Sequence, residues 1–91
     1  MAERYAPQGK LDLAAVSDLH AWFISSKGQD LVLDLQDVSL FGALCVQCCL
    51  VGANAAQTAG NSFQITGASE AVLAQLSSMG FTPESLSEGS T

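Results

Sequence analysis

The fold of this chain is decided by residues 31–50, which read LVLDLQDVSLFGALCVQCCL. Residues 31–35 are a short apolar run of strand length, interrupted only by Asp34. From Ala43 the chain is almost wholly apolar to about residue 59, which predicts a buried helix. A strand followed by a loop and a helix is half of a crossover between two parallel strands.

The loop between this strand and this helix is the expected functional site. In open α/β sheets, binding sites collect at the carboxyl ends of the strands. We therefore expect the activity of the protein to centre on Phe41, Gly42, Ala43 and Leu44.

The flanking sequence extends the alternation of strands and helices. The helix after residue 14 is indicated by apolar residues at spacings of three and four, and Ser69 is suited to cap the last helix. Phe81 and Leu86 are expected to fold back onto the core. The predicted elements are a short edge strand near residues 4–6, an extended segment at 10–13, a helix from 14 to about 26, a strand at 31–35, a helix from 43 to about 59, a strand at 62–66 and a helix from about 70 to 79. This order predicts an α/β fold with a mostly parallel sheet and right-handed crossovers.

The composition describes one small, apolar domain. The chain has 91 residues, of which 48% are hydrophobic and 13% are charged. We expect a single domain over residues 1–86 and a loose tail at 87–91. No apolar run reaches the roughly 20 residues of a membrane span, and the N-terminus lacks the apolar core of a signal peptide. The expected location is the cytoplasm, and the high apolar fraction is compatible with a homodimer.

The charge balance excludes two classes of partner. The net charge is -6, and the only Lys and Arg residues are Arg4, Lys10 and Lys27. Phosphate backbones are bound by clustered Lys and Arg side chains. Three scattered cations do not form such a cluster, so we expect neither nucleic acid binding nor membrane binding.

The three cysteines permit three interpretations. Cys45 and Cys48 have the C-x-x-C spacing of a redox pair at the start of a helix, where a thiol pKa is lowered. No aromatic-rich loop precedes them, however, and the only later proline is Pro83. Cys45, Cys48 and Cys49 also share one helical face, which favours core packing over redox chemistry. A zinc site would need a fourth ligand, and the only histidine lies on another element.

The histidine and the acidic residues around the central strand have structural interpretations as well. His20 belongs to no catalytic spacing, so we interpret it as a surface or half-buried structural residue. Asp30 and Asp34 alternate onto one side of the strand and, with Asp37, could form a cation site. Strand-end solvation and turn formation explain these carboxylates more simply. No catalytic residue, metal or cofactor is therefore predicted.

The loop that enters the central helix is unusually apolar. A helix start normally carries Ser, Thr or Asp, whereas Leu40, Phe41, Ala43 and Leu44 stand here. Either these side chains fold inward, or they form an apolar contact patch at the carboxyl end of the strand.

The order of several short segments resembles the STAS domain, the family of bacterial anti-sigma factor antagonists and of sulfate-transporter cytoplasmic tails. The resemblance rests on residues 9–16 (GKLDLAAV), on residues 30–35 (DLVLDL) and on residues 37–39 (DVS) leading into a helix. It covers residue 9 to about residue 86. It implies a STAS-like mixed, mostly parallel sheet of four to five strands flanked by about three helices, and a protein–protein interaction module that is not an enzyme.

The family's phosphorylation motif is degenerate in this chain. The motif reads Asp-Ser-Ser-Gly or Asp-Ser-Thr-Gly, and it falls without gaps on residues 42–45, Gly-Ala-Leu-Cys. Ala43 and Leu44 occupy the serine positions, and Leu44 has no hydroxyl to accept phosphate. Phosphorylation would add about two negative charges at this point, and this chain has lost that control. Residues 41–47 also resemble a STAS variant encoded with bacterial chemotaxis and histidine-kinase genes.

The resemblance and the apolar loop together predict a docking module of bacterial signal transduction. Its partner would be a histidine kinase or an anti-sigma-factor-like kinase. Alternatives are a thiol redox protein using Cys45 and Cys48, a STAS subunit of a lipid-transport ABC complex, and residual phosphorylation at Ser39. The predicted partner-binding residues are Asp12, Leu40, Phe41, Gly42, Ala43 and Leu44.

Overall fold

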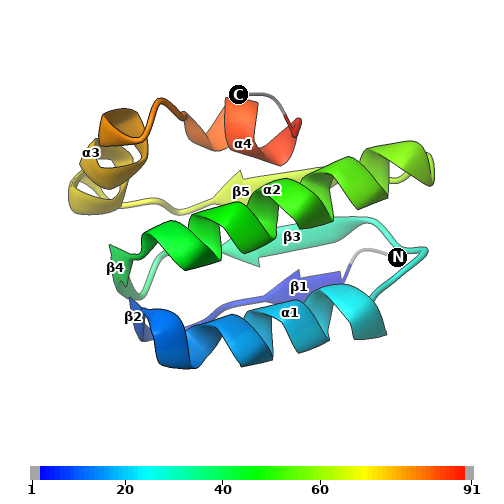
Figure 1. Ribbon diagram of the computed structural model, residues 1–91, viewed down its shortest axis with the longest axis horizontal. Helices are drawn as coiled ribbons and strands as arrows, with labels where there is room; N and C mark the ends of the chain where they lie inside the picture. The colour runs from blue at the N-terminus through cyan, green and yellow to red at the C-terminus, as the bar shows by residue number, and fades with distance from the viewer. Residues whose placement is uncertain (1–2, 90–91) are drawn as a thin grey trace.

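The computed structural model describes residues 3–89, which form a small α/β structure (Figure 1). The elements in chain order are β1 (Glu3–Tyr5), β2 (Gly9–Leu11), the short 3-10 helix η1 (Leu13–Ala15), α1 (Val16–Ser25), β3 (Leu31–Asp34), β4 (Val38–Phe41), α2 (Ala43–Thr58), β5 (Phe63–Thr66), α3 (Glu70–Ser78) and α4 (Pro83–Ser87). The predicted alternation of strands and helices is confirmed at this level.

The strands form two parallel sheets instead of the one mixed sheet that was predicted. One sheet has the order β1-β3-β5, and the other pairs β2 with β4. Every pairing among the described strands is parallel. In the larger sheet Tyr5 lies beside Leu33, and Leu33 lies beside Ile65.

The two sheets are consecutive parts of the same two chain segments. The segment from β1 to β2 runs beside the segment from β3 to β4, and the pairing is interrupted between them. Pro7 lies in this gap and has no N–H for the ladder. Opposite, the N–H of Val38 turns back to the carbonyl of Leu35 (3.1 Å). Pairing resumes where the N–H of Gly9 bonds the carbonyl of Asp37 (2.9 Å).

Strand β4 was missed in the sequence, where residues 38–41 read as a loop. Val38 and Phe41 are buried, whereas Ser39 and Leu40 between them are exposed. This burial pattern departs from strict alternation, the usual signal of a strand. The strand exists because β2 supplies its backbone partners.

Helices α1 and α2 lie side by side over the three-stranded sheet (Figure 1). The buried strand residues Leu31, Leu33 and Phe63 contribute to the core that the two helices help to cover. At their junction Phe23 of α1 stacks edge-on against Phe63 of β5, with ring centroids 5.5 Å apart. Gly52 of α2 faces the Phe23 ring, and the absence of a side chain there lets the two helices pack closely.

The C-terminal part contains a helix that the sequence analysis did not identify. Thr82 and Ser85 form a reciprocal capping box at the start of α4. The helix packs against β5 and α2 and buries Leu86 completely, as predicted for that residue. Ser87 belongs to α4, so the predicted tail begins later, and its residues 90–91 lie outside the described range.

Candidate interaction surface between helices α1 and α2

The start of α2 is held against the end of β2. The N–H of Gly42 donates to the carbonyl of Leu11 (2.8 Å), just beyond the pairing of Leu11 with Phe41. A Cβ at Gly42 would lie 2.9 Å from that carbonyl oxygen and 3.7 Å from the Cα of Asp12. Glycine therefore allows Asp12 and the first turn of α2 to meet, as the predicted site requires.

Four apolar side chains are exposed at this end of the molecule, and we call them the rim: Leu13, Leu40, Ala43 and Leu44. Leu44 is 54% exposed, Leu40 is 37% exposed and Leu13 is 73% exposed. Asp12 beside them is exposed and accepts a hydrogen bond from the N–H of Ala14 (3.1 Å), which caps η1. Leu13 was missed in the sequence because its place in an apolar segment resembled that of a core residue.

Phe41 does not belong to this surface, although it was predicted to bind the partner. Its side chain is only 1% exposed, and its backbone N–H donates to Oε1 of Gln75 on α3 (2.6 Å). For Phe41 the alternative, that the loop folds inward, is the correct one. Gly42 is half-buried and contributes through its backbone.

The residues that the STAS resemblance aligns with a phosphorylation motif lie at the N-cap and in the first turn of α2. Gly42 is the N-cap and provides no side-chain hydrogen bond to the helix. Ala43 and Leu44 are both exposed and have no hydroxyl. Ser39 is also exposed, but it lies on β4 and outside the helix.

The cysteines are placed as packing residues. Cys45 and Cys49 are fully buried, and Cys48 is half-buried. Burial raises the pKa of Cys48, and it raises the pKa of Cys49 well above the usual 9.0. Burial, together with the nearby Cys48 and Asp12, also raises the pKa of Cys45. A redox pair needs an accessible thiolate, so these environments do not favour redox chemistry.

The carboxylates around β3 are used in turns and ion pairs. Asp34 pairs with Arg4 and accepts the N–H of Gln36 (3.0 Å), while Asp30 accepts the N–H of Ser62 (2.9 Å). The preferred interpretation of Asp30 and Asp34 as structural residues is therefore confirmed. Within residues 3–89, no three His, Cys, Asp or Glu side chains group closely enough to hold a metal ion.

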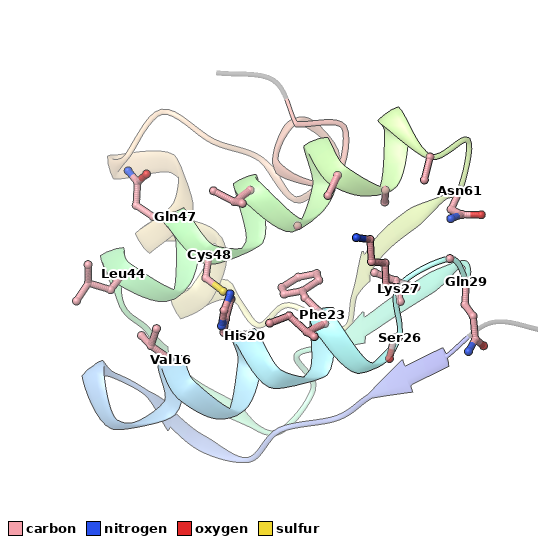
Figure 2. Close-up of a pocket in the computed structure, with 18 residues that line it drawn as sticks. Val16, His20, Phe23, Ser26, Lys27, Gln29, Leu44, Gln47, Cys48 and Asn61 are labelled. Atoms are coloured by element: carbon pink, nitrogen blue, oxygen red, sulfur yellow. The ribbon is translucent and has the colours of Figure 1, made fainter.

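A groove between α1 and α2 was not predicted from the sequence (Figure 2). Its volume is about 520 Å³, and it begins at Leu44, so it continues from the rim. Val51 is 67% exposed and Ile24 is 61% exposed along it. The prediction that the helix after residue 43 is buried is therefore wrong for this side of α2. The apolar part of its lining includes Val16, Phe23, Ile24, Cys48, Val51 and Ala55.

Two ionisable side chains from α1 and the turn after it also border the groove, His20 and Lys27. His20 is exposed, as expected for a surface histidine, and lines the groove from α1 (Figure 2). Lys27 lies near the opposite end, beyond the last residue of α1.

No protein-family model and no curated protein sequence matches the chain. Across the part of the chain that the structure describes, none of the helices combines the length and apolar character needed to cross a membrane.

Proposed function

We propose that this protein is a STAS-like, non-enzymatic docking module of bacterial signal transduction that acts in the cytoplasm. The observation that carries the proposal is the exposure of Leu44, at 54%, in the first turn of α2 beside Asp12. A large apolar side chain exposed at a helix start costs free energy in water unless a partner covers it. Leu13, just before α1, and Leu40, on β4, are two further exposed leucines at this end of the molecule.

The docking is proposed to be independent of phosphorylation at the family's usual position. A phosphoserine there would add about two charges and would change which partner binds. Leu44 instead provides a permanent apolar contact. The partner we propose is a histidine kinase or an anti-sigma-factor-like kinase, and a lipid-transport ABC complex is the alternative.

The experiment is the Leu44→Asp substitution, tested against candidate partners encoded by the genes next to this one. Asp in the first turn of a helix interacts favourably with the helix dipole, by about 0.3–1 kcal/mol, and this offsets the lost apolar contacts. We therefore expect the thermal melting temperature to stay nearly unchanged while capture of the partner is abolished.

The matched control is Asn54→Asp, which adds the same charge at an exposed position of the same helix, about 15 Å further along it. This variant should retain partner capture. Collapse of the Leu44→Asp melting transition would show that Leu44 is a core residue, and full capture by a folded Leu44→Asp variant would contradict the proposal.

A further inference from the structure

The groove between α1 and α2 is large enough and apolar enough to hold a partner segment. Its volume of about 520 Å³ lies within the usual range of binding sites, about 300–1,000 Å³. Ile24 and Val51 are exposed on the two helices that border it, and Ala55 is a small exposed residue along α2. Small residues let another helix approach to the normal interaxial distance of about 8–10 Å.

The charge of the groove is opposite to that of the whole protein. Among residues 3–89 there are nine Asp and Glu residues, and none of them lines the groove. Lys27, one of only three Lys and Arg residues in the chain, does line it, together with His20. A segment that binds here would therefore be favoured by a carboxylate near Lys27.

The shape and charge select one occupant. We infer that the groove binds an amphipathic helix of the signalling partner, with apolar side chains toward Ile24 and Val51 and an acidic residue toward Lys27. Helix α1 has ten residues and is about 15 Å long at 1.5 Å per residue, so about three turns of a partner helix fit beside it. Such a helix would present anchors at positions i, i+3 or i+4, and i+7.

A second copy of the chain fits less well. A two-fold dimer through this groove would bring the same surface of each copy together, so it would supply no acidic residue from the groove lining to face Lys27. An anionic membrane surface would be repelled by the net charge of -6.

This inference rests on the proposed function, because it names the chemistry of the partner, and it extends the contact from the rim along the groove. Leu44 belongs to both surfaces. The groove is tested without Leu44 so that the two proposals can fail separately.

The probes are two stapled helical peptides with identical leucine anchors, one flanked by glutamates and one by lysines. Each is titrated into the ¹⁵N-labelled protein at about 0.15 M salt, where the Debye length is about 8 Å and distant charges are screened. We expect the glutamate peptide to bind about two- to fivefold more tightly, with amide shifts confined to α1 and α2. The net charge of the protein alone would favour the lysine peptide, so the order of the two affinities is decisive.

Two variants locate the binding, and one serves as a control. Val51→Asp should weaken the glutamate peptide by about tenfold or more, and Lys27→Glu should reverse the preference between the peptides. Asn54→Asp adds the same charge to an exposed position on α2 that does not line the groove. It should change the affinity by less than about twofold.

Three results would overturn the inference. The first is tighter binding of the lysine peptide, and the second is the absence of peptide-induced amide shifts at the groove. The third is amide shifts at the groove that depend on protein concentration, because these would identify a second copy of the chain as the occupant. If Leu40→Asp abolishes partner capture and Val51→Asp does not, docking at the rim stands and the groove is not used. If neither Leu40→Asp nor Leu44→Asp affects capture while the peptides still bind as expected, docking at the rim fails.

Discussion

Asp34, the last residue of β3, has a structural role at its carboxylate. Asp30 and Asp34 alternate onto one side of the strand, which permits a cation site, although structural roles explain them more simply. In the fold, the carboxylate of Asp34 accepts a hydrogen bond from the N–H of Gln36 and forms an ion pair with the guanidinium of Arg4. The hydrogen bond from Gln36, together with Arg4, holds the pKa of Asp34 below its usual 3.8.

Replacing Asp34 tests this role through the pH dependence of stability. Because the carboxylate pKa is lowered in the folded state, its contribution to stability is present above pH 3.8 and is lost as the pH falls below that value. We expect Asp34→Asn to melt at a lower temperature than the wild type at pH 7. The difference should shrink as the pH falls below 3.8.

The measurement is thermal unfolding followed by circular dichroism over this pH range. Asp37→Asn, at an exposed position in the turn before β4, is the control and should change the melting temperature little. A constant difference between the wild type and Asp34→Asn at every pH would contradict the assignment.

At the scale of elements, the position of α2 depends on its contact with α1. Three aromatic contacts connect β1, α1 and β5: Tyr5 with Trp22 at 5.4 Å, Trp22 with Phe23 at 5.0 Å, and Phe23 with Phe63 at 5.5 Å between ring centroids. Gly52 lies against the Phe23 ring, so α2 approaches this aromatic cluster closely. Phe23 and Gly52 both line the groove, so this contact between the two helices is part of its surface.

The substitution Gly52→Val should separate the two helices. A Cβ at Gly52 would lie 2.7 Å from Cζ of Phe23, and valine adds two further methyl groups. Overpacking of this kind costs about 1–3 kcal/mol, partly offset because glycine is a poor helix former. We expect a net loss of about 1–2 kcal/mol in the free energy of unfolding, measured by urea denaturation.

The control for this prediction is Ala55→Val, one turn further along the same helix. Ala55 is exposed, so the free energy of unfolding should change by less than about 0.5 kcal/mol. Equal effects at the two positions would show that helix propensity, and not the contact with Phe23, determines the result.

At the scale of the whole molecule, the C-terminal segment closes the core. Leu86 is 0% exposed although it lies on a helix of only five residues. A helix this short is not stable alone, so its tertiary contacts with β5 and α2 hold it in place. The C-terminal end of the chain therefore contributes to the stability of elements that are distant in sequence.

Leu86→Ala should accordingly destabilise the whole domain. Removing a fully buried leucine side chain costs about 2–5 kcal/mol, a large part of the roughly 5–15 kcal/mol that stabilises a typical domain. Leu73→Ala on α3, where the leucine is 40% exposed, should cost less than half as much. Chemical denaturation of both variants measures the comparison, and equal losses would contradict the closing role of α4.

The local sequence predicted most elements because their signals are local. The apolar run before Asp34, the spacing of apolar residues in α1 and the cap at Ser69 each depend on neighbouring residues, and Ser69 indeed accepts the N–H of Val72 (3.3 Å). Strand β4 and helix α4 were missed because β4 takes its partners from β2 and α4 needs β5 and α2. The exposure of the candidate surface was predicted in part: Leu40 and Leu44 are exposed where apolar side chains were expected at the surface, but Phe41 is buried.

The sequence by itself determined that this is an α/β chain whose central helix starts with the apolar residues Ala43 and Leu44. Only the tertiary structure decided which apolar residues remain exposed. Val51 and Cys49 lie on the same apolar helix, yet one is 67% exposed and the other is fully buried. The difference arises because α2 can face the sheet with only one side, and α1, more than fifteen residues earlier in the chain, forms the other wall of the groove.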